Sequence, residues 1–165
     1  MKEAEIYIEQ HKFIRKKLLD LLDEISSSEF SEESLHWMMP FGNPGRAHIS
    51  WQFMHCAATL DRYLNARILS GNVKDEKLVN GFAGGSIPDP AKIIAPDEIR
   101  MQLEKTTEPY FQYFLSLEES RLSEMPNPDA GRTHREILQL LNWHEAHHHG
   151  QCQIIWNSFR NKSTN

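Results

Sequence analysis

The sequence has few of the features that mark secreted, membrane-spanning or disulfide-rich proteins. It contains two cysteines, Cys56 and Cys152, which stand far apart and form no close-spaced motif. This usage favours two buried thiols in a reduced compartment over a disulfide framework. No apolar run approaches the roughly 18 residues of a membrane span, and no cationic–apolar leader is present. We therefore expect a cytoplasmic protein that does not act at a membrane.

An excess of charge of one sign is also missing. The formal net charge is −5, and acidic and basic residues are both scattered along the chain. Without a basic stripe, nothing indicates a nucleic-acid partner. A length of 165 residues suits one domain, at roughly 100–200 residues per domain. Residues 1–165 are therefore predicted to form a single domain.

Four long segments have apolar residues at helical spacing. They cover residues 2–25, 47–70, 95–119 and 133–159. Thr133 and Glu136 have the spacing of a capping box at the start of the last segment. Pro109 lies inside the third segment and should kink it. The segments predict four long helices.

The connections between these segments show no confident strand. Residues 31–37 are expected to form a short helical turn, and the prolines and glycines of 40–45 predict a loop. Residues 71–94 include the glycine-rich stretch 81–85, which looks too irregular for a helix. The pattern predicts an all-α four-helix bundle with a long connection between helices two and three. Because of that connection, helices two and three are expected to run parallel.

Histidines are concentrated in the last predicted helix, where four of the nine fall within residues 144–149. His144 and His148 are four residues apart on the core-facing stripe, so two imidazoles can share one metal ion. His55 lies on the inner face of the second helix and can meet them across the bundle. A lone buried histidine is more often a hydrogen-bonded core residue, which is the alternative for His55. The spacing predicts a metal site of His55, His144 and His148.

The same segment satisfies the His-Glu-x-x-His pattern of zinc proteases, from His144 to His148. Such enzymes usually take a third ligand from further along the chain, and they hold the peptide beside an edge strand. Few residues follow His148, none of them aspartate or glutamate, and no strand is expected. A protease is therefore disfavoured.

Two stretches resemble the DinB/YfiT-like metal-binding four-helix bundles. The first is Ser-Trp-Gln-Phe-Met-His-Cys at residues 50–56, continuing to residue 65, and the second is His-Glu-Ala-His-His-His-Gly-Gln at residues 144–151. The resemblance implies His55, His144 and His148 as ligands. His149 stands where the family commonly has arginine.

The resemblance also implies a function. Members of this family bind a divalent ion (zinc, nickel, manganese or iron), often form homodimers, and include transferases that use low-molecular-weight thiols. For this chain, zinc or nickel and a small thiol cofactor are expected. Three imidazoles and a water are typical of a catalytic rather than a structural zinc site. The mechanistic hypothesis is that a thiolate in the fourth position attacks an electrophilic substrate.

Two further residues are weaker candidates, and the overall function has an alternative. Glu145 is assigned a catalytic role, either orienting a ligand or accepting a proton, against the alternative of an ordinary solvated glutamate. Gln151 is assigned to cofactor binding, against a role in helix packing. The favoured function is a metal-dependent thiol transferase or hydrolase. The alternative is a non-catalytic metal-binding or stress-response bundle, in which the ion mainly joins the helices.

Overall fold

The computed structural model describes residues 2–40 and 47–163, and the predicted loop at 40–45 lies almost entirely outside them. The described part contains α-helices and short 3₁₀ and π segments, without a strand, which confirms the all-α prediction. The α-helices are α1 (Glu3–Ser26), α2 (Ser31–His36), α3 (Ile49–Asp61), α4 (Glu76–Phe82), α5 (Pro96–Ser116) and α6 (His134–Ser163). None of the described helices is long and apolar enough to cross a membrane.

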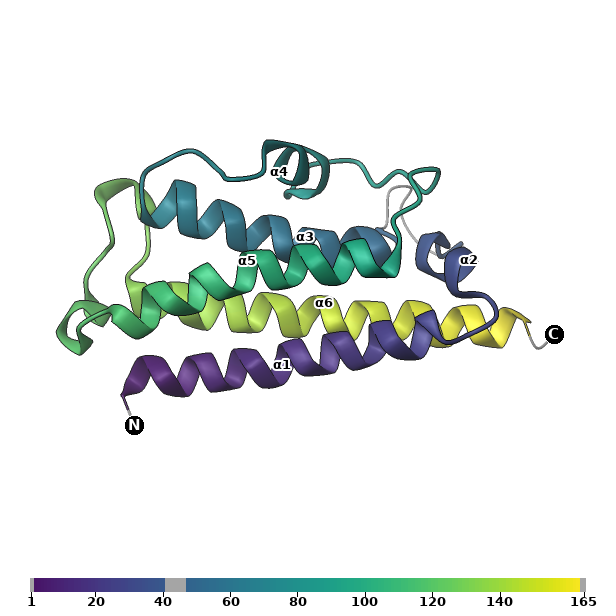
Figure 1. Cartoon of the computed structure of the whole chain (residues 1–165), viewed down its shortest axis with the longest axis horizontal. Helices are drawn as coiled ribbons and strands as arrows, with labels where there is room; N and C mark the ends of the chain where they lie inside the picture. Colours follow the sequence, from purple (N-terminus) through teal and green to yellow (C-terminus); the bar gives the residue numbers. More distant parts are fainter. Residues whose placement is uncertain (1, 41–46, 164–165) are drawn as a thin grey trace.

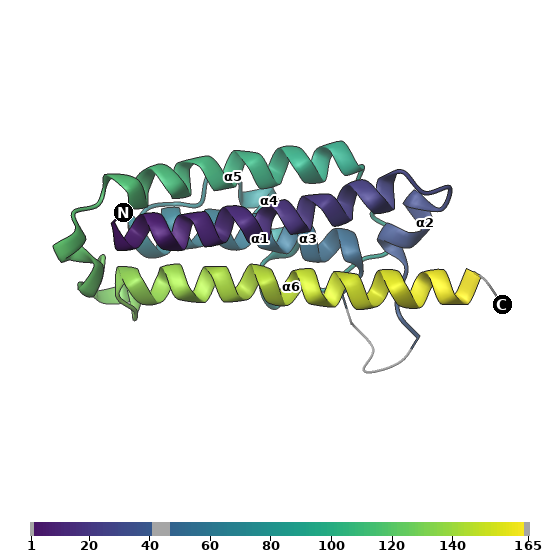
Figure 2. The ribbon, with the colours of Figure 1, turned by 90° about the horizontal axis from the view of Figure 1, so that it is seen from below.

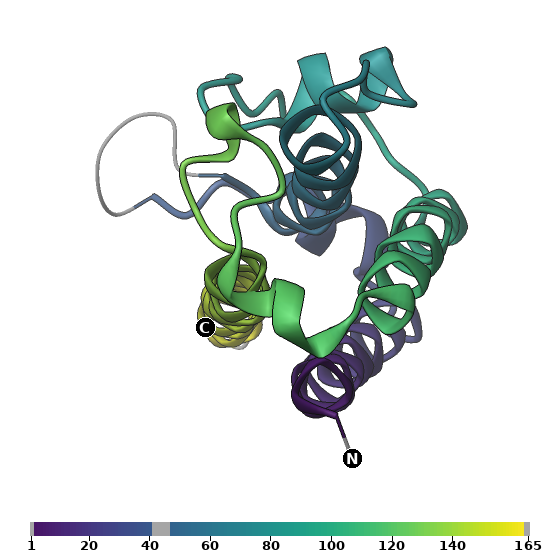
Figure 3. The same cartoon turned by 90° about the vertical axis from the view of Figure 1, so that its left-hand side faces the viewer.

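The four longest helices lie side by side along the long axis of the molecule. Seen end on, α1, α3, α5 and α6 surround a common centre (Figure 3). The helices α3 and α5 run in the same direction, opposite to α1 and α6 (Figure 1). The helix α1 lies between α5 and α6 and packs against both (Figure 2). The second and third long helices predicted from the sequence correspond to α3 and α5, and these two are parallel neighbours.

The apolar core is divided into two clusters by a layer of polar side chains. One cluster includes Leu18 and Leu103, and the other includes Ile8 and Tyr110. On α1 and α5, buried polar residues stand between the two clusters in chain order. On α6, the same interval separates Leu141 from Cys152 and contains the histidines. Burial of apolar surface therefore holds the helices together on both sides of the polar layer that contains the histidines.

The second predicted helix changes its hydrogen-bonding pattern part of the way along. The α-helix α3 ends at Asp61 and continues as a π-helix, η1 (Arg62–Ile68). Within this region the amide of Leu69 bonds to the carbonyl of Leu64, five residues earlier, at 3.0 Å. The buried Asp61 accepts hydrogen bonds from the backbone amides of Lys74 and Asp75, at 2.9 and 2.8 Å. These bonds fasten the start of the following connection to the end of α3.

The prediction that the glycine-rich stretch is not helical is wrong in part, because α4 extends through Gly81 to Phe82. Asp75 caps the helix by accepting from the amide of Leu78 at 2.9 Å, as short polar residues do at helix starts. Leu78 and Phe82 are buried in the core cluster that includes α3. The cap and this buried face outweigh the low helix propensity of one glycine.

The last two long helices differ slightly from their predicted limits. The helix α5 continues through Pro109 but ends at Ser116, and a 3₁₀ segment (Glu119–Ser123) follows. The capping box before α6 is confirmed: the Glu136 amide donates to Thr133 Oγ1 at 3.2 Å, and the Thr133 amide donates to the Glu136 carboxylate at 2.7 Å. The helix α6 then runs past its predicted end at Phe159 to Ser163.

Candidate metal centre

Three histidines from two helices converge at the polar layer of the core. His55 comes from α3, and His144 and His148 come from adjacent turns of α6. One ring nitrogen of each lies within 4.8 Å of the others. The Nε2 atoms of His55 and His144 are 3.0 Å apart, and the three ring centroids are 4.5 to 4.9 Å apart. We call His55, His144 and His148 the histidine triad.

The orientation of two of these rings is set by acceptors behind them. Nδ1 of His55 donates to the carbonyl of Phe82 at 2.6 Å, and Nδ1 of His148 donates to Oε1 of Gln52 at 2.8 Å. The Gln52 amide is itself oriented, because its Nε2 donates to the carbonyl of Ala47. A carbonyl oxygen can only accept, so both Nδ1 atoms carry the proton and both Nε2 atoms keep a lone pair. Metal-binding histidines are typically held in this way.

The environment also favours the neutral form of each imidazole. Burial lowers the pKa of His55 below its ordinary value. Burial and then the neighbouring His55 lower the pKa of His144 to about 4. Burial, followed by His144 and His55, lowers the pKa of His148 to about 3. All three rings are therefore neutral at pH 7, which is the form that binds a metal ion.

The dimensions of the histidine triad fit a first-row divalent ion. Zinc–nitrogen bonds of about 2.0–2.1 Å in tetrahedral geometry place two ligand nitrogens roughly 3.3 Å apart. The His55–His144 pair is already near this separation at 3.0 Å, and the widest separation of 4.8 Å requires only a small closure of the side chains. Three nitrogen ligands leave a fourth position for water or substrate.

An aromatic side chain and the turn after α4 hold His55 in place. The indole of Trp51 stacks on the His55 ring, with centroids 4.7 Å apart and planes inclined by 9°. Its Nε1 donates to the hydroxyl of Ser86 at 3.2 Å. Together with the bond from His55 to Phe82, this ties the turn that follows α4 to the histidine triad.

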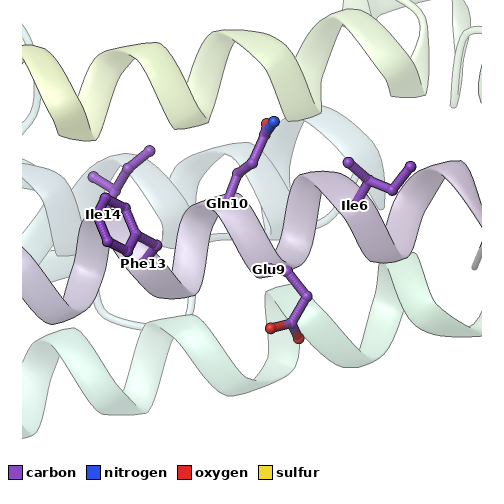
Figure 4. A pocket seen from close by; sticks show the side chains of 5 residues that line it. All are labelled: Ile6, Glu9, Gln10, Phe13 and Ile14. Carbon is purple, nitrogen blue, oxygen red and sulfur yellow. The ribbon is translucent and has the colours of Figure 1, made fainter.

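Two cavities adjoin the residues of the site. One of about 220 Å³ is lined by His55 and by residues of η1 and the turn after α4. Another of about 380 Å³ is lined by Gln52 and Gln151. A third hollow, of about 470 Å³, lies on the outer face of α1 and is bordered by Ile6, Phe13 and neighbouring side chains, not by the histidine triad (Figure 4). Free volume thus borders the histidine triad at His55.

The structure overturns the alternative that Glu145 is an ordinary solvated residue. Glu145 is 2% exposed, and its two oxygens accept from Arg15 of α1 at 2.5 and 2.6 Å. Nε2 of His11 lies 3.0 Å from the same carboxylate, and Arg15 also donates to the carbonyl of Leu103 on α5. Burial would raise the pKa of Glu145, but Arg15 and then His11 outweigh it and hold that pKa well below its ordinary value.

The sequence alone did not reveal a role for Arg15 and His11, because their partner Glu145 lies far away in the sequence, on another helix. Both stand at helical spacing with Leu18 and Leu22 on the buried face of α1. Two polar residues on an apolar stripe signal a partner elsewhere in the core, because an unpaired buried charge is costly. Gln52, three residues before His55 on α3, carried the same signal.

The other predicted residues have the following contacts. Gln151 lies one turn after His147, and its Nε2 is 2.7 Å from His147 Nε2; its cofactor role stays a prediction, as does the catalytic role of Glu145. Cys56 and Cys152 are buried and unbridged, as predicted. Burial raises the pKa of both thiols.

The fold and the histidine triad define an all-helical protein with a candidate three-histidine metal site. Its sequence matches the family model of the DinB superfamily over residues 10–152, and the chain belongs to that superfamily. The matched range contains all three histidines, in agreement with the resemblance seen in the sequence. No match was found among curated proteins or among solved structures.

Proposed function

We propose that this protein is a metal-dependent enzyme that acts on a small molecule, with a divalent ion held by His55, His144 and His148. The observation that carries the proposal is the convergence of three neutral imidazoles, two of which have Nδ1 held by an acceptor. We further propose that the chain forms a single four-helix-bundle domain of the DinB type. The segment joining η1 to α5 is then the long connection of that bundle.

The donor set favours zinc or nickel, because imidazole nitrogen suits both ions, while manganese or iron are less favoured choices. When bound, the ion would act as a Lewis acid that lowers the pKa of a water or thiol in its free position. The protein would supply the orientation of the three rings and a partly desolvated pocket. A low-molecular-weight thiol as cosubstrate, and therefore a thiol transferase reaction, is the favoured activity.

Access to the histidine triad favours an enzyme over a purely structural site. His144 and His148 are only partly buried, and His55 borders the 220 Å³ cavity. A closed structural site normally surrounds its ion with four protein ligands. The alternative, a non-catalytic metal-binding bundle, predicts that removal of the ion melts the fold.

The first experiment is elemental analysis of untagged protein, with His55→Ala, His144→Ala and His148→Ala beside the wild type. His147→Ala is the matched control, because His147 is an exposed imidazole on the same helix outside the histidine triad. We expect near-stoichiometric metal in the wild type and the control, and its loss in the three variants. Equal metal content in all five proteins would contradict the proposed metal site.

A second measurement separates the two functions. The loaded and the chelator-treated proteins are compared by thermal unfolding and by a screen of small thiols with electrophilic substrates. An enzyme is expected to keep its fold without metal and to lose turnover. Unfolding on metal removal together with no turnover in the loaded protein would favour the structural alternative.

A further inference from the structure

The cavity beside His55 carries a concentration of positive charge. Its lining consists of His55, Thr59, Arg62, Tyr63, Arg67, Ala83 and Gly84, without a carboxylate. Arg62 is exposed and forms no side-chain hydrogen bond or ion pair with any residue of the described ranges. Among the residues that the structure describes, the guanidinium of Arg67 bonds only to the backbone carbonyl of Asp129, at 3.5 Å. Two guanidinium groups without acidic partners thus border one cavity of about 220 Å³.

The π-helix explains why both arginines border the same cavity. In an α-helix, residues five apart point about 140° away from each other, at 100° per residue. In a π-helix, hydrogen bonds connect residues five apart, so these residues lie near one another on one face. Arg62 and Arg67 are the first and sixth residues of η1. A continued α-helix would turn one of them away, and π segments are frequent at functional sites.

We propose that this cavity is an anion-binding subsite, in which Arg62 and Arg67 hold a carboxylate or phosphate group of the substrate. The inference rests on the proposed function, since it places the rest of the substrate at the histidine triad. Arg62 follows His55 by seven residues, or about 10 Å along the helix. The substrate is therefore a small molecule that carries an acidic group at some distance from its reacting atom. Arginine suits this role because its planar fork binds such groups with two parallel hydrogen bonds.

The hydroxyl groups of the lining complete the recognition. Thr59 and Tyr63 border the same cavity and offer hydrogen-bond donors. Ala83 and Gly84 of the turn after α4 also line the cavity, and Gly84 has open space around the position of a Cβ atom. The same turn is linked to the histidine triad through Phe82 and His55. An anion at the arginines would thus occupy the same cavity that His55 of the triad borders.

The test is calorimetric titration with inorganic phosphate and, separately, with succinate at constant ionic strength. The proteins are the wild type, Arg62→Gln, Arg67→Gln and Arg100→Gln, each in metal-loaded and chelator-treated form. Arg100 is the matched control because it pairs with Asp23 on the surface and does not line the cavity. We expect each cavity variant to bind at least one of the two anions about fivefold to tenfold more weakly, the loss of one charged hydrogen-bonding partner, with the control unchanged.

Metal content of the same samples distinguishes this inference from the proposed function. If the two cavity variants bind both anions as tightly as the control, the anion subsite is wrong, whatever the metal content. If arginine-dependent binding is found in protein that never retains metal, the subsite stands and the metal proposal fails. The dissociation constant of each variant is divided by that of the wild type. This ratio is compared in the form, metal-loaded or chelator-treated, that circular dichroism shows to be folded. Equal weakening in Arg100→Gln would also overturn the subsite, because it would show only an effect of net charge.

Discussion

The carboxylate of Glu145 on α6 accepts two hydrogen bonds from the guanidinium of Arg15 on α1, at 2.5 and 2.6 Å. Glu145 directly follows His144 in the sequence, so this bidentate pair sets the rotation of α6 at the level of the histidine triad. At this level α6 thus pairs with α1 through Glu145, while His144 and His148 approach His55 of α3. The same turn of helix joins the polar layer of the core to the candidate metal site.

Removing one member of this pair should strongly destabilise the fold. Arg15→Met leaves a buried carboxylate without its main partner, which typically costs about 3–5 kcal/mol. We expect a loss of that size in the free energy of unfolding, measured by urea denaturation at pH 7. Arg135→Gln is the control, because Arg135 pairs with the partly exposed Glu3 and such surface pairs contribute little to stability. Equal effects of the two substitutions would contradict this account of the buried pair.

The hydrogen bond from His148 to Gln52 should contribute to metal affinity. Gln52→Ala removes the acceptor that holds Nδ1 of His148 and orients its ring. Loss of such a supporting contact typically weakens metal binding about 10–100-fold. Competition with a chelating dye measures the affinity. Gln139→Ala removes an exposed glutamine that bonds only to Tyr7 and should leave the affinity unchanged. An unaltered affinity in Gln52→Ala would show that His148 does not depend on this contact.

Acid should destabilise the protein partly through His48. This residue caps α3 by accepting from the Trp51 amide, and burial, followed by the nearby His36, lowers its pKa to about 4. The unfolded value is about 6.5, so the unfolded chain binds the proton first as the pH falls. Stability is therefore complete above pH 6.5, falls between about pH 6.5 and 4, and then levels off.

The variant His48→Asn isolates this contribution, since asparagine is also a good N-cap but does not titrate. Urea unfolding at pH 7.5, 5.5 and 4 should show a smaller loss on acidification in the variant than in the wild type. We expect the difference to be on the order of 3 kcal/mol at pH 4, from about 1.4 kcal/mol per unit of pKa. Parallel curves for the two proteins would mean that His48 is not the group responsible.

The homodimer expected from the family resemblance remains a prediction, and we propose the outer face of α1 as its interface. Ile6 and Phe13 are 45% and 62% exposed there and border the hollow in Figure 4. Glu5 and Glu9 precede Lys12, Lys16 and Lys17 along this part of α1. Antiparallel packing against a second copy around Ile6 and Phe13 would therefore place these glutamates of one copy near these lysines of the other.

Phe13→Ser should lower the dimer fraction, because it removes the largest exposed apolar side chain of this face. Light scattering with size-exclusion chromatography at several protein concentrations gives the mass. Leu69→Ser, at an exposed apolar residue after η1, is the control and should behave as the wild type. A dimer that persists unchanged in Phe13→Ser would place the interface elsewhere.

Much of the fold and two of the three residues of the triad followed from local features of the sequence. Apolar residues at helical spacing predicted the long helices, and the capping box before α6 was read from Thr133 and Glu136. The four-residue interval between His144 and His148 places two imidazoles on one face of any α-helix. These features depend on hydrogen bonds and side-chain spacing within a few residues, which the sequence alone determines.

Only the tertiary structure decided which side chains meet. Three features depend on the packing of distant segments. They are the change from α-helix to π-helix at Arg62, the helical conformation of α4 and the burial of Glu145. Arg15 and Glu145 are 130 residues apart, and no local pattern states that their helices touch at that level. The rotation of each helix is set by how all its neighbours bury apolar surface and pair charges at once. For that reason, the sequence determined which residues share a helix face, and the packing decided what each face contacts.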